Sequence, residues 1–295
     1  MLDPNKFFKK SKIENTNTIL SYLEEFNELY KNRPIKSNQG GMMFPHMFGL
    51  FYFLKSLKPT FVVESGIWKG QSTWLIEKVM PKANILSIDT NLNKRQYISK
   101  SKRVNYTNED FRFIDFKKIS KKNSLVFFDD HQNFFDRILQ CHFFGFKTII
   151  LDDNYPPHIG DCYSFKKIFS NTDMQRKFHF KWKLKISKNI CVYFFKKFFF
   201  DKKKETLDVN LYDYGFSDTK ANLNMELTLK KMIFEYFEFP PIFKKDTVNL
   251  ENTKFKKFYS QKEPLLKTTK YNIEKYKSAY IERNMYNWMT YVKLK

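Results

Sequence analysis

The sequence predicts an α/β fold built on a doubly wound, mostly parallel sheet. Four short apolar runs recur between residues 61 and 151, each bounded by polar or glycine residues, and helix-length segments separate them. Runs of this kind are typical of strands buried on both faces of a sheet. Their alternation with helices indicates parallel pairing through right-handed crossovers. We therefore expect ligands to bind beyond the carboxyl ends of these strands.

Two helices are expected ahead of the sheet. Apolar residues recur at helical spacing in residues 15–31, where Asn15 or Thr16 can cap the helix, and a second helix is expected over 46–57. The sheet strands are then predicted at 61–63, 85–88, 104–107, 125–128 and 148–151. The intervening helices are predicted at 71–79, 94–102 and 133–144.

Beyond residue 163 the pattern is weaker. We expect a strand at 190–195, a helix at 226–238 stopped by two prolines, a helix at 271–284 and a final strand at 286–294. A strand reached after a long insertion indicates an antiparallel edge strand. The sequence thus predicts a helical N-terminal extension over 1–58 and an α/β domain over 59–295, with residues 165–285 as a basic, aromatic-rich insertion or cap.

Composition limits the class of protein. The chain has 295 residues, 42% of them hydrophobic and 19% aromatic, with only 8 glycines and 10 prolines. These values exclude collagen-like and fully disordered chains, and no apolar run approaches the roughly 20 residues of a membrane-spanning helix. The three cysteines lie far apart without a C-x-x-C pair, and residues 1–17 have no apolar stretch, so we expect no secretory signal there. We expect a reducing, cytoplasmic location.

The net charge of +22 does not by itself indicate a nucleic-acid-binding protein. Only seven of the 53 basic residues are arginine, the side chain that best matches phosphates and bases. A lysine- and asparagine-rich sequence is also what an AT-rich genome encodes on any exposed surface. Residues 165–204, with thirteen basic residues against two acidic ones, stay a candidate surface for nucleic acid, an acidic glycan or anionic lipid.

A glycine turn follows the first predicted strand. Gly66 permits a sharp turn, Gly70 permits close approach of a ligand or close packing, and Ser72 lies in the first turn of the next helix, where free N–H groups gather. The spacing fits neither the dinucleotide fingerprint nor a Walker A loop. An ordinary strand-to-helix turn is the alternative.

Two acidic residues stand at the ends of the next strands. Asp89 follows Gly66 by 23 residues, which is the place for an acid that accepts hydrogen bonds from ribose hydroxyls. Asp110 follows the third strand and could hydrogen-bond an adenine amino group. A cap on the following segment is the alternative for each residue.

Two acidic doublets follow the fourth and fifth strands. They are Asp129-Asp130, with His131 next to them, and Asp152-Asp153. Adjacent strands lie about 4.8 Å apart, so carboxylates at their ends repel unless they are protonated or bridged by a cation. Oxygen ligands favour Mg²⁺, Mn²⁺ or Ca²⁺, and a histidine is suited to act as a base near neutral pH. The alternative is that each doublet caps a helix or turn.

Together these motifs resemble the class I S-adenosylmethionine-dependent methyltransferases over residues 60–160. The nearest group is the metal-assisted small-molecule and sugar O-methyltransferases, including the macrolide-sugar and cephalosporin-hydroxylase-like branch. The resemblance implies a Rossmann-like methyltransferase fold and S-adenosylmethionine bound by Glu64, Gly66, Gly70, Ser72, Asp89, Asp110 and Asp129. It further implies a divalent cation, Mg²⁺ first, held by Asp129, Asp152 and Asp153, with His131 and Asp130 as catalytic residues.

The function expected from this resemblance is O-methylation of a small-molecule or sugar hydroxyl, free or in a glycan. Trp68-Lys69 departs from the family pattern, which has a glycine there. One alternative is an RNA or DNA methyltransferase that uses residues 165–204 as its binding surface. Another is a catalytically inactive, methyltransferase-like interaction module. A homo-oligomer is compatible with each of these.

Overall fold

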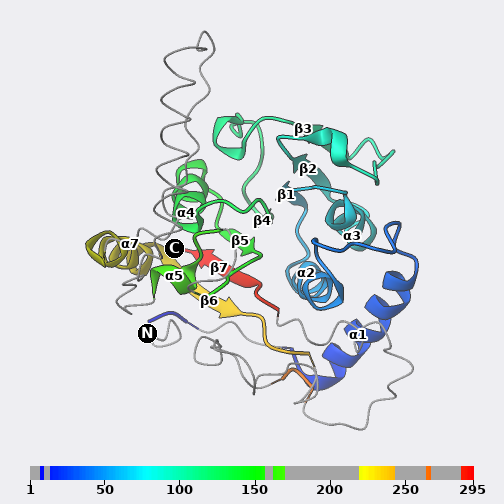
Figure 1. The fold of residues 1–295 in the computed structure, drawn as a ribbon, viewed down its shortest axis with the longest axis horizontal. Helices are drawn as coiled ribbons and strands as arrows, with labels where there is room; N and C mark the ends of the chain where they lie inside the picture. The colour runs from blue at the N-terminus through cyan, green and yellow to red at the C-terminus, as the bar shows by residue number, and fades with distance from the viewer. Residues whose placement is uncertain (1–6, 10–13, 157–161, 170–218, 243–263, 267–286) are drawn as a thin grey trace, which may run out of the picture.

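A seven-stranded sheet organises the residues that the computed structural model describes, which are 7–9, 14–156, 162–169, 219–242, 264–266 and 287–295. The strand order is β3-β2-β1-β4-β5-β7-β6. The parallel strands are β1 (Phe61–Ser65), β2 (Asn84–Ile88), β3 (Val104–Thr107), β4 (Ser124–Phe128) and β5 (Thr148–Leu151). β7 (Thr290–Leu294) runs antiparallel to both β5 and β6 (Ile233–Glu238). The predicted doubly wound, mostly parallel, Rossmann-like fold class is confirmed (Figure 1).

Successive residues of the central strands pack on opposite faces of the sheet. One side of the sheet carries α1 (Thr16–Lys31), α2 (Phe44–Leu57) and α3 (Gln71–Val79), with α2 between α1 and the strands. The other side carries α4 (Phe134–Phe144), α5 (Phe165–Ile168) and α7 (Thr219–Met232), as Figure 1 shows. In β4, Leu125 and Phe127 belong to the first hydrophobic cluster, while Val126 and Phe128 belong to the second. Burial on both faces explains why the strands appear in the sequence as continuous apolar runs.

The N-terminal helices belong to the same hydrophobic cluster as the sheet. The Asn15 side chain caps α1 by accepting a hydrogen bond from the Thr18 amide, as predicted. α2 begins at Phe44, two residues earlier than expected, because Pro45 suits the first turn of a helix. Eleven consecutive residues of α2, from Phe44 to Leu54, are buried. The helix therefore fills the space between α1 and the sheet.

The helix predicted over 94–102 is wrong. Only a short 3₁₀ turn, Leu92–Lys94, forms there. The amides of Gln96 and Tyr97 both donate to the carbonyl of Lys69 in the glycine turn, and the Ser99 amide donates to the hydroxyl of Tyr106. These N–H groups are used for tertiary contacts, so the segment supports the glycine turn instead of forming a helix.

The helix predicted over 226–238 is only partly right. α7 ends at Met232 and β6 begins at Ile233, because the aromatic-rich sequence IFEYFE favours a strand and pairs with β7. β6 forms the outer edge of the sheet, and the predicted antiparallel last strand lies one position inside it. The elements predicted at 190–195 and 271–284 lie outside the described residues. Within the part of the chain described, no helix is both long and apolar enough to cross a bilayer.

Replacing Gly66 with alanine should destabilise the fold more than replacing Gly145. Both glycines have left-handed backbones, with φ of 96° and 81°, but a Cβ on Gly66 would lie 2.1 Å from the Asp129 carbonyl oxygen. A Cβ on Gly145 would meet only Lys121 Cγ, at 3.6 Å. We expect Gly66→Ala to lower the free energy of unfolding by about 2–5 kcal/mol and Gly145→Ala by about 1–2 kcal/mol in urea denaturation. Equal losses of unfolding free energy in the two variants would contradict the close approach of Gly66, after β1, to the Asp129 carbonyl, after β4.

Candidate functional site

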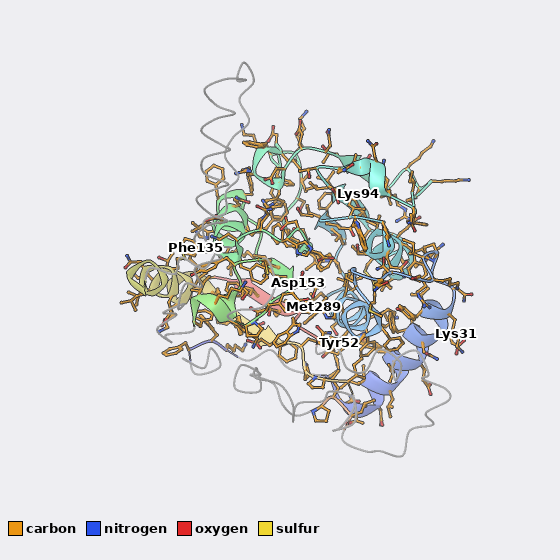
Figure 2. All side chains as sticks on the ribbon, viewed as in Figure 1. Lys31, Tyr52, Lys94, Phe135, Asp153 and Met289 are labelled. Atoms are coloured by element: carbon orange, nitrogen blue, oxygen red, sulfur yellow. The ribbon has the colours of Figure 1, made fainter. Side chains whose placement is uncertain are left out.

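A cavity of about 930 Å³ opens at the carboxyl ends of the parallel strands. Asp153, which lies near the middle of the view in Figure 2, is part of its wall. Its volume is in the range of pockets that hold small organic ligands, about 300–1,000 Å³. The cavity brings together eight of the residues singled out in the sequence: Gly66, Asp89, Asp110, Asp129, Asp130, His131, Asp152 and Asp153.

The glycine turn is fixed to the end of β2. The Gly66 amide donates to the Ile88 carbonyl over 2.9 Å, and Asp89 Oδ2 accepts from the amides of Ile67 and Trp68 over 3.0 and 2.8 Å. Asp89 Oδ1 accepts from the Asn91 amide over 2.8 Å. A carboxylate has about four acceptor positions, so Asp89 orders the turn and keeps about one acceptor position for a ligand.

Three predicted cofactor residues, Glu64, Gly70 and Ser72, are not among the residues that line this cavity. Glu64 is fully buried behind the turn and accepts from the hydroxyls of Thr73 and Ser87 over 2.6 and 2.7 Å. Burial raises the pKa of Glu64, and the hydrogen bond from Ser72 opposes that rise. Gly70 begins α3, where a Cβ would lie 2.5 Å from the Tyr97 carbonyl oxygen. These residues support the turn from behind.

Trp68 occupies a position at which the methyltransferase family that the sequence resembles has a glycine. Its backbone has a left-handed conformation, with φ of 44°, which is the conformation that favours glycine. Its ring packs against the loop before α2, so closely that a Cβ on Gly41 would lie 2.6 Å from Trp68 Cζ3. The Lys69 ammonium lies 4.1 Å from the centroid of the same ring. The N-terminal loop and the glycine turn are thereby joined into one wall of the cavity.

A buried arginine joins two of the predicted acidic residues. Arg137, on α4, donates through both terminal nitrogens to Asp110 over 3.2 Å each and lies 2.7 Å from Asp130 Oδ2. Burial alone would raise the pKa of Asp110, but the hydrogen bonds and charge of Arg137 outweigh it and lower the pKa. Arg112 supplies an amide and a side-chain contact to the same carboxylate. The acceptor positions of Asp110 are therefore largely used within the protein.

Asp130, a predicted catalytic residue, is similarly engaged. Its Oδ2 accepts from the Ser65 hydroxyl over 2.6 Å in addition to the ion pair with Arg137. The geometry suits Asp130 to fixing the ends of β1 and α4 against each other.

Asp129, Asp152 and Asp153 form the acidic part of the cavity. Burial, followed by the negative charges of Asp152 and Asp153, raises the pKa of Asp129 well above its usual range. Burial and the charge of Asp152 likewise raise the pKa of Asp153 to about 6, although His46 and His131 oppose that rise. The neighbouring Tyr155 hydroxyl, whose pKa is raised by burial and by Asp153, stays neutral and hydrogen-bonds to Asp153. This is the convergence of carboxylates that the sequence predicted.

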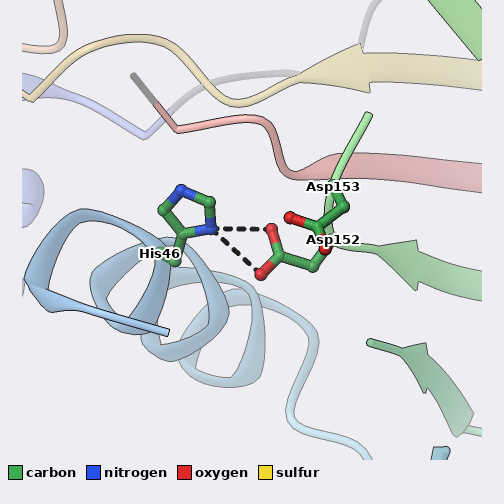
Figure 3. Close-up of side chains that lie close together, drawn as sticks. All are labelled: His46, Asp152 and Asp153. Atoms are coloured by element: carbon green, nitrogen blue, oxygen red, sulfur yellow. Dashed lines mark hydrogen bonds and ion pairs between the residues drawn. The ribbon is translucent and has the colours of Figure 1, made fainter. Parts of the chain in front are cut away.

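Two histidines flank these carboxylates. His131 Nδ1 lies 3.4 Å from Asp153 Oδ2, and its side chain is half exposed at the rim of the cavity. His46, on α2, is buried, with its Nδ1 2.8 and 2.9 Å from the two Asp152 oxygens (Figure 3). The potential ligand atoms form two groups, His46–Asp152–Asp153 and Asp129–His131–Asp153, each lying within 4.8 Å of one another.

His46 and Arg137 are site residues that sequence reasoning missed. His46 lies 106 residues from Asp152 in the mainly apolar helix α2, and Arg137 is one basic residue among 53. The available signal was a polar residue inside a buried pattern, namely a histidine in the apolar run of α2 and an arginine on the inner face of α4. Buried charged groups are rare unless they are paired.

No family model and no curated protein sequence matches this chain. Solved structures match it at low similarity. The cmcI-N160 SAH structure is 16% identical over 41% of this chain and 66% of its own, with a TM-score of 0.33. The SAH-bound methyltransferase PaMTH1 from Podospora anserina is 12% identical over 49% and 64%, with a TM-score of 0.32.

The plantazolicin methyltransferase BpumL in complex with SAH is 15% identical over 96% of this chain and 86% of its own, again with a TM-score of 0.32. The chain spans just under two thirds of the length of the first solved structures that it matches. At this level of similarity no residue assignment is transferred from those structures.

Removing Arg137 should destabilise the fold strongly. Arg137→Met leaves Asp110 and Asp130 without their shared cation, and we expect the free energy of unfolding to fall by about 3 kcal/mol. Arg112→Met is the matched control, because Arg112 also contacts Asp110 but is 45% exposed. It should cost less than about 1 kcal/mol. Similar urea midpoints for the two variants would contradict the prediction, because the buried Arg137 would then stabilise the fold no more than the exposed Arg112.

The stability of the cation-free protein should depend on Asp153 and pH. A folded-state pKa of about 6, raised from 3.8, means that the folded protein binds more protons than the unfolded chain between these values. The contribution of Asp153 to stability is therefore fully present below pH 4 and is lost as the pH rises through 6. With EDTA present, Asp153→Asn should be about 1–3 kcal/mol more stable than wild type at pH 7.5 and little different at pH 4. A constant difference across this range would contradict the assignment.

Proposed function

We propose that this protein is an S-adenosylmethionine-dependent methyltransferase that methylates a hydroxyl of a small molecule or sugar with the help of a divalent cation. One observation carries the proposal. A single cavity combines the glycine turn and Asp89 with the carboxylates of Asp129, Asp152 and Asp153. The first set suits a nucleoside cosubstrate and the second suits a hard cation.

The cosubstrate half of the cavity supports the proposal through Asp89. This residue lies at the carboxyl end of β2, lines the cavity and keeps about one acceptor position for a ribose hydroxyl. Asp110 and Arg137 line the next part of the wall as an ion pair. Arg137 Nε is buried without a hydrogen-bond partner in the described structure.

The cation half fits through its donor set. Asp129, Asp152 and Asp153 supply hard oxygen ligands, the kind that Mg²⁺ and Mn²⁺ prefer. The raised pKa values of Asp129 and Asp153 reflect burial first and, after it, repulsion from the neighbouring carboxylates. A divalent cation would relieve that repulsion. Once bound, such a cation would lower the pKa of a substrate hydroxyl beside it.

Proton removal is assigned to His131. The imidazole lies at the cavity rim, is half exposed, and contacts Asp153 over 3.4 Å. Asp153 orients the ring, and solvent at the rim can receive the proton after it leaves the hydroxyl. Asp130, bound to Ser65 and Arg137, holds the turn that precedes His131. Positioning of the two substrates by the shared cavity would supply much of the rate acceleration.

Calorimetric titration with S-adenosylhomocysteine, with and without MgCl₂, tests the proposal directly. Wild type should bind, and Asp89→Ala should bind at least 10-fold more weakly. With labelled S-adenosylmethionine and a panel of sugar and phenolic hydroxyl acceptors, Asp152→Asn should lose transfer while it binds S-adenosylhomocysteine within threefold of wild type.

Asp115→Asn, a change at an exposed acid outside the cavity wall, is the control and should behave as wild type in both assays. Absence of heat and of any thermal shift, with and without MgCl₂, would overturn the proposal. That result would favour an interaction module that has kept the fold without the activity.

A further inference from the structure

The geometry points to His46 as a positioning residue that fixes the carboxylate of Asp152 for cation binding. The inference deepens the proposed function and rests on its cation site. It adds a residue from α2, far from the acidic doublets in sequence, to the machinery at the strand ends.

The contact joins two buried side chains. His46 Nδ1 lies 2.8 Å from Asp152 Oδ1 and 2.9 Å from Oδ2, and the side chains are 5% and 2% exposed. Figure 3 shows the ring nitrogen in front of both oxygens, with Asp153 beside them. A single N–H shared between two carboxylate oxygens restrains rotation of the carboxylate. Hydrogen bonds of this kind to a metal-binding carboxylate hold it in its ligating orientation.

The position of His46 is fixed from behind. Asn287, which is 2% exposed, donates to the Pro45 carbonyl over 2.7 Å and accepts from the Met289 amide over 2.8 Å. The first turns of α2 lie so close to this residue that a Cβ on Gly49 would be 2.6 Å from Asn287 Nδ2. The start of α2 therefore cannot slide without breaking buried hydrogen bonds.

The same stretch of chain fixes the loop that carries Asp152. The Asn154 amide donates to the Trp288 carbonyl over 2.9 Å, and its side chain donates to the hydroxyls of Thr290 and Tyr236 over 2.7 and 3.1 Å. Residues 287–290 thus anchor both partners of the His46–Asp152 pair. The distance between His46 and Asp152 is therefore fixed by the hydrogen bonds that both segments make to residues 287–290.

Direct ligation by His46 is the competing assignment, because its ring is one of the groups near Asp152 and Asp153. The observed contact favours positioning. Nδ1, which lies within 2.9 Å of both Asp152 oxygens, is placed to donate its proton to them. That nitrogen cannot also bind a cation, so ligation by His46 would have to use Nε2. Asparagine can imitate the Nδ1–H donor of histidine, whereas glutamine places its amide farther out and leucine has no donor.

Titration with Mn²⁺, followed by the electron paramagnetic resonance signal of the free ion, tests the inference. Wild type should bind Mn²⁺, and Asp152→Asn should lose this binding. His46→Leu and His46→Gln should bind 10–100-fold more weakly, the usual cost of removing a residue that orients a ligand, and His46→Asn should stay within about fivefold of wild type. His142→Leu, at an exposed histidine on α4, is the matched control and should bind normally.

Binding of S-adenosylhomocysteine reports on folding and should stay within twofold in every His46 variant. If His46→Leu does not fold, the contrast between the Asn and Gln variants decides. Wild-type affinity in His46→Leu or in His46→Gln would overturn the inference and leave the cation site standing. Equal weakness of the Asn and Gln variants would also overturn it, in favour of ligation. Failure of wild type to bind Mn²⁺ better than Asp152→Asn would instead defeat the proposed function.

Discussion

Strands β1, β4 and β5 end side by side, and the acidic residues after β4 and β5 share one cavity wall. Parallel pairing makes this unavoidable, because every strand of such a sheet delivers its carboxyl end to the same edge. The consequence is electrostatic. Burial and neighbouring negative charge favour protonation of carboxylates, and both raise the pKa of Asp129 and of Asp153. The other residues of the site offset the repulsion between these carboxylates at the carboxyl edge of the sheet.

The compensation is divided between the two helical layers. On the α4 side, Arg137 neutralises Asp110 and Asp130 and packs against Phe111 and Phe128. On the α2 side, the His46 ring contacts the Asp152 carboxylate from within the buried stretch Phe44–Leu54. Asp129 and Asp153 are left with mutual repulsion that these two residues do not cancel. That remainder is the physical reason for expecting a cation between them.

The sheet was predictable because strands that are buried on both faces appear in the sequence as continuous apolar runs. The acidic doublets were predictable because they directly follow two of these runs. Local pattern failed where tertiary contacts decide. In the 94–102 segment, the amides of Gln96 and Tyr97 donate hydrogen bonds to the glycine turn and not to a helix. The sequence IFEYFE forms β6 because β7 pairs with it. The pairing of His46 with Asp152 spans 106 residues. No local signal in the sequence specifies such a contact.

The most direct test of the account is a crystal structure of the protein soaked with MnCl₂ and S-adenosylhomocysteine, with anomalous diffraction data collected at the manganese edge. We expect one strong peak within about 2.3 Å of carboxylate oxygens from Asp152 and from Asp153 or Asp129, with the nucleoside lying beside Asp89. An empty acidic cluster in crystals that hold the nucleoside, or a peak elsewhere on the molecule, would contradict the account.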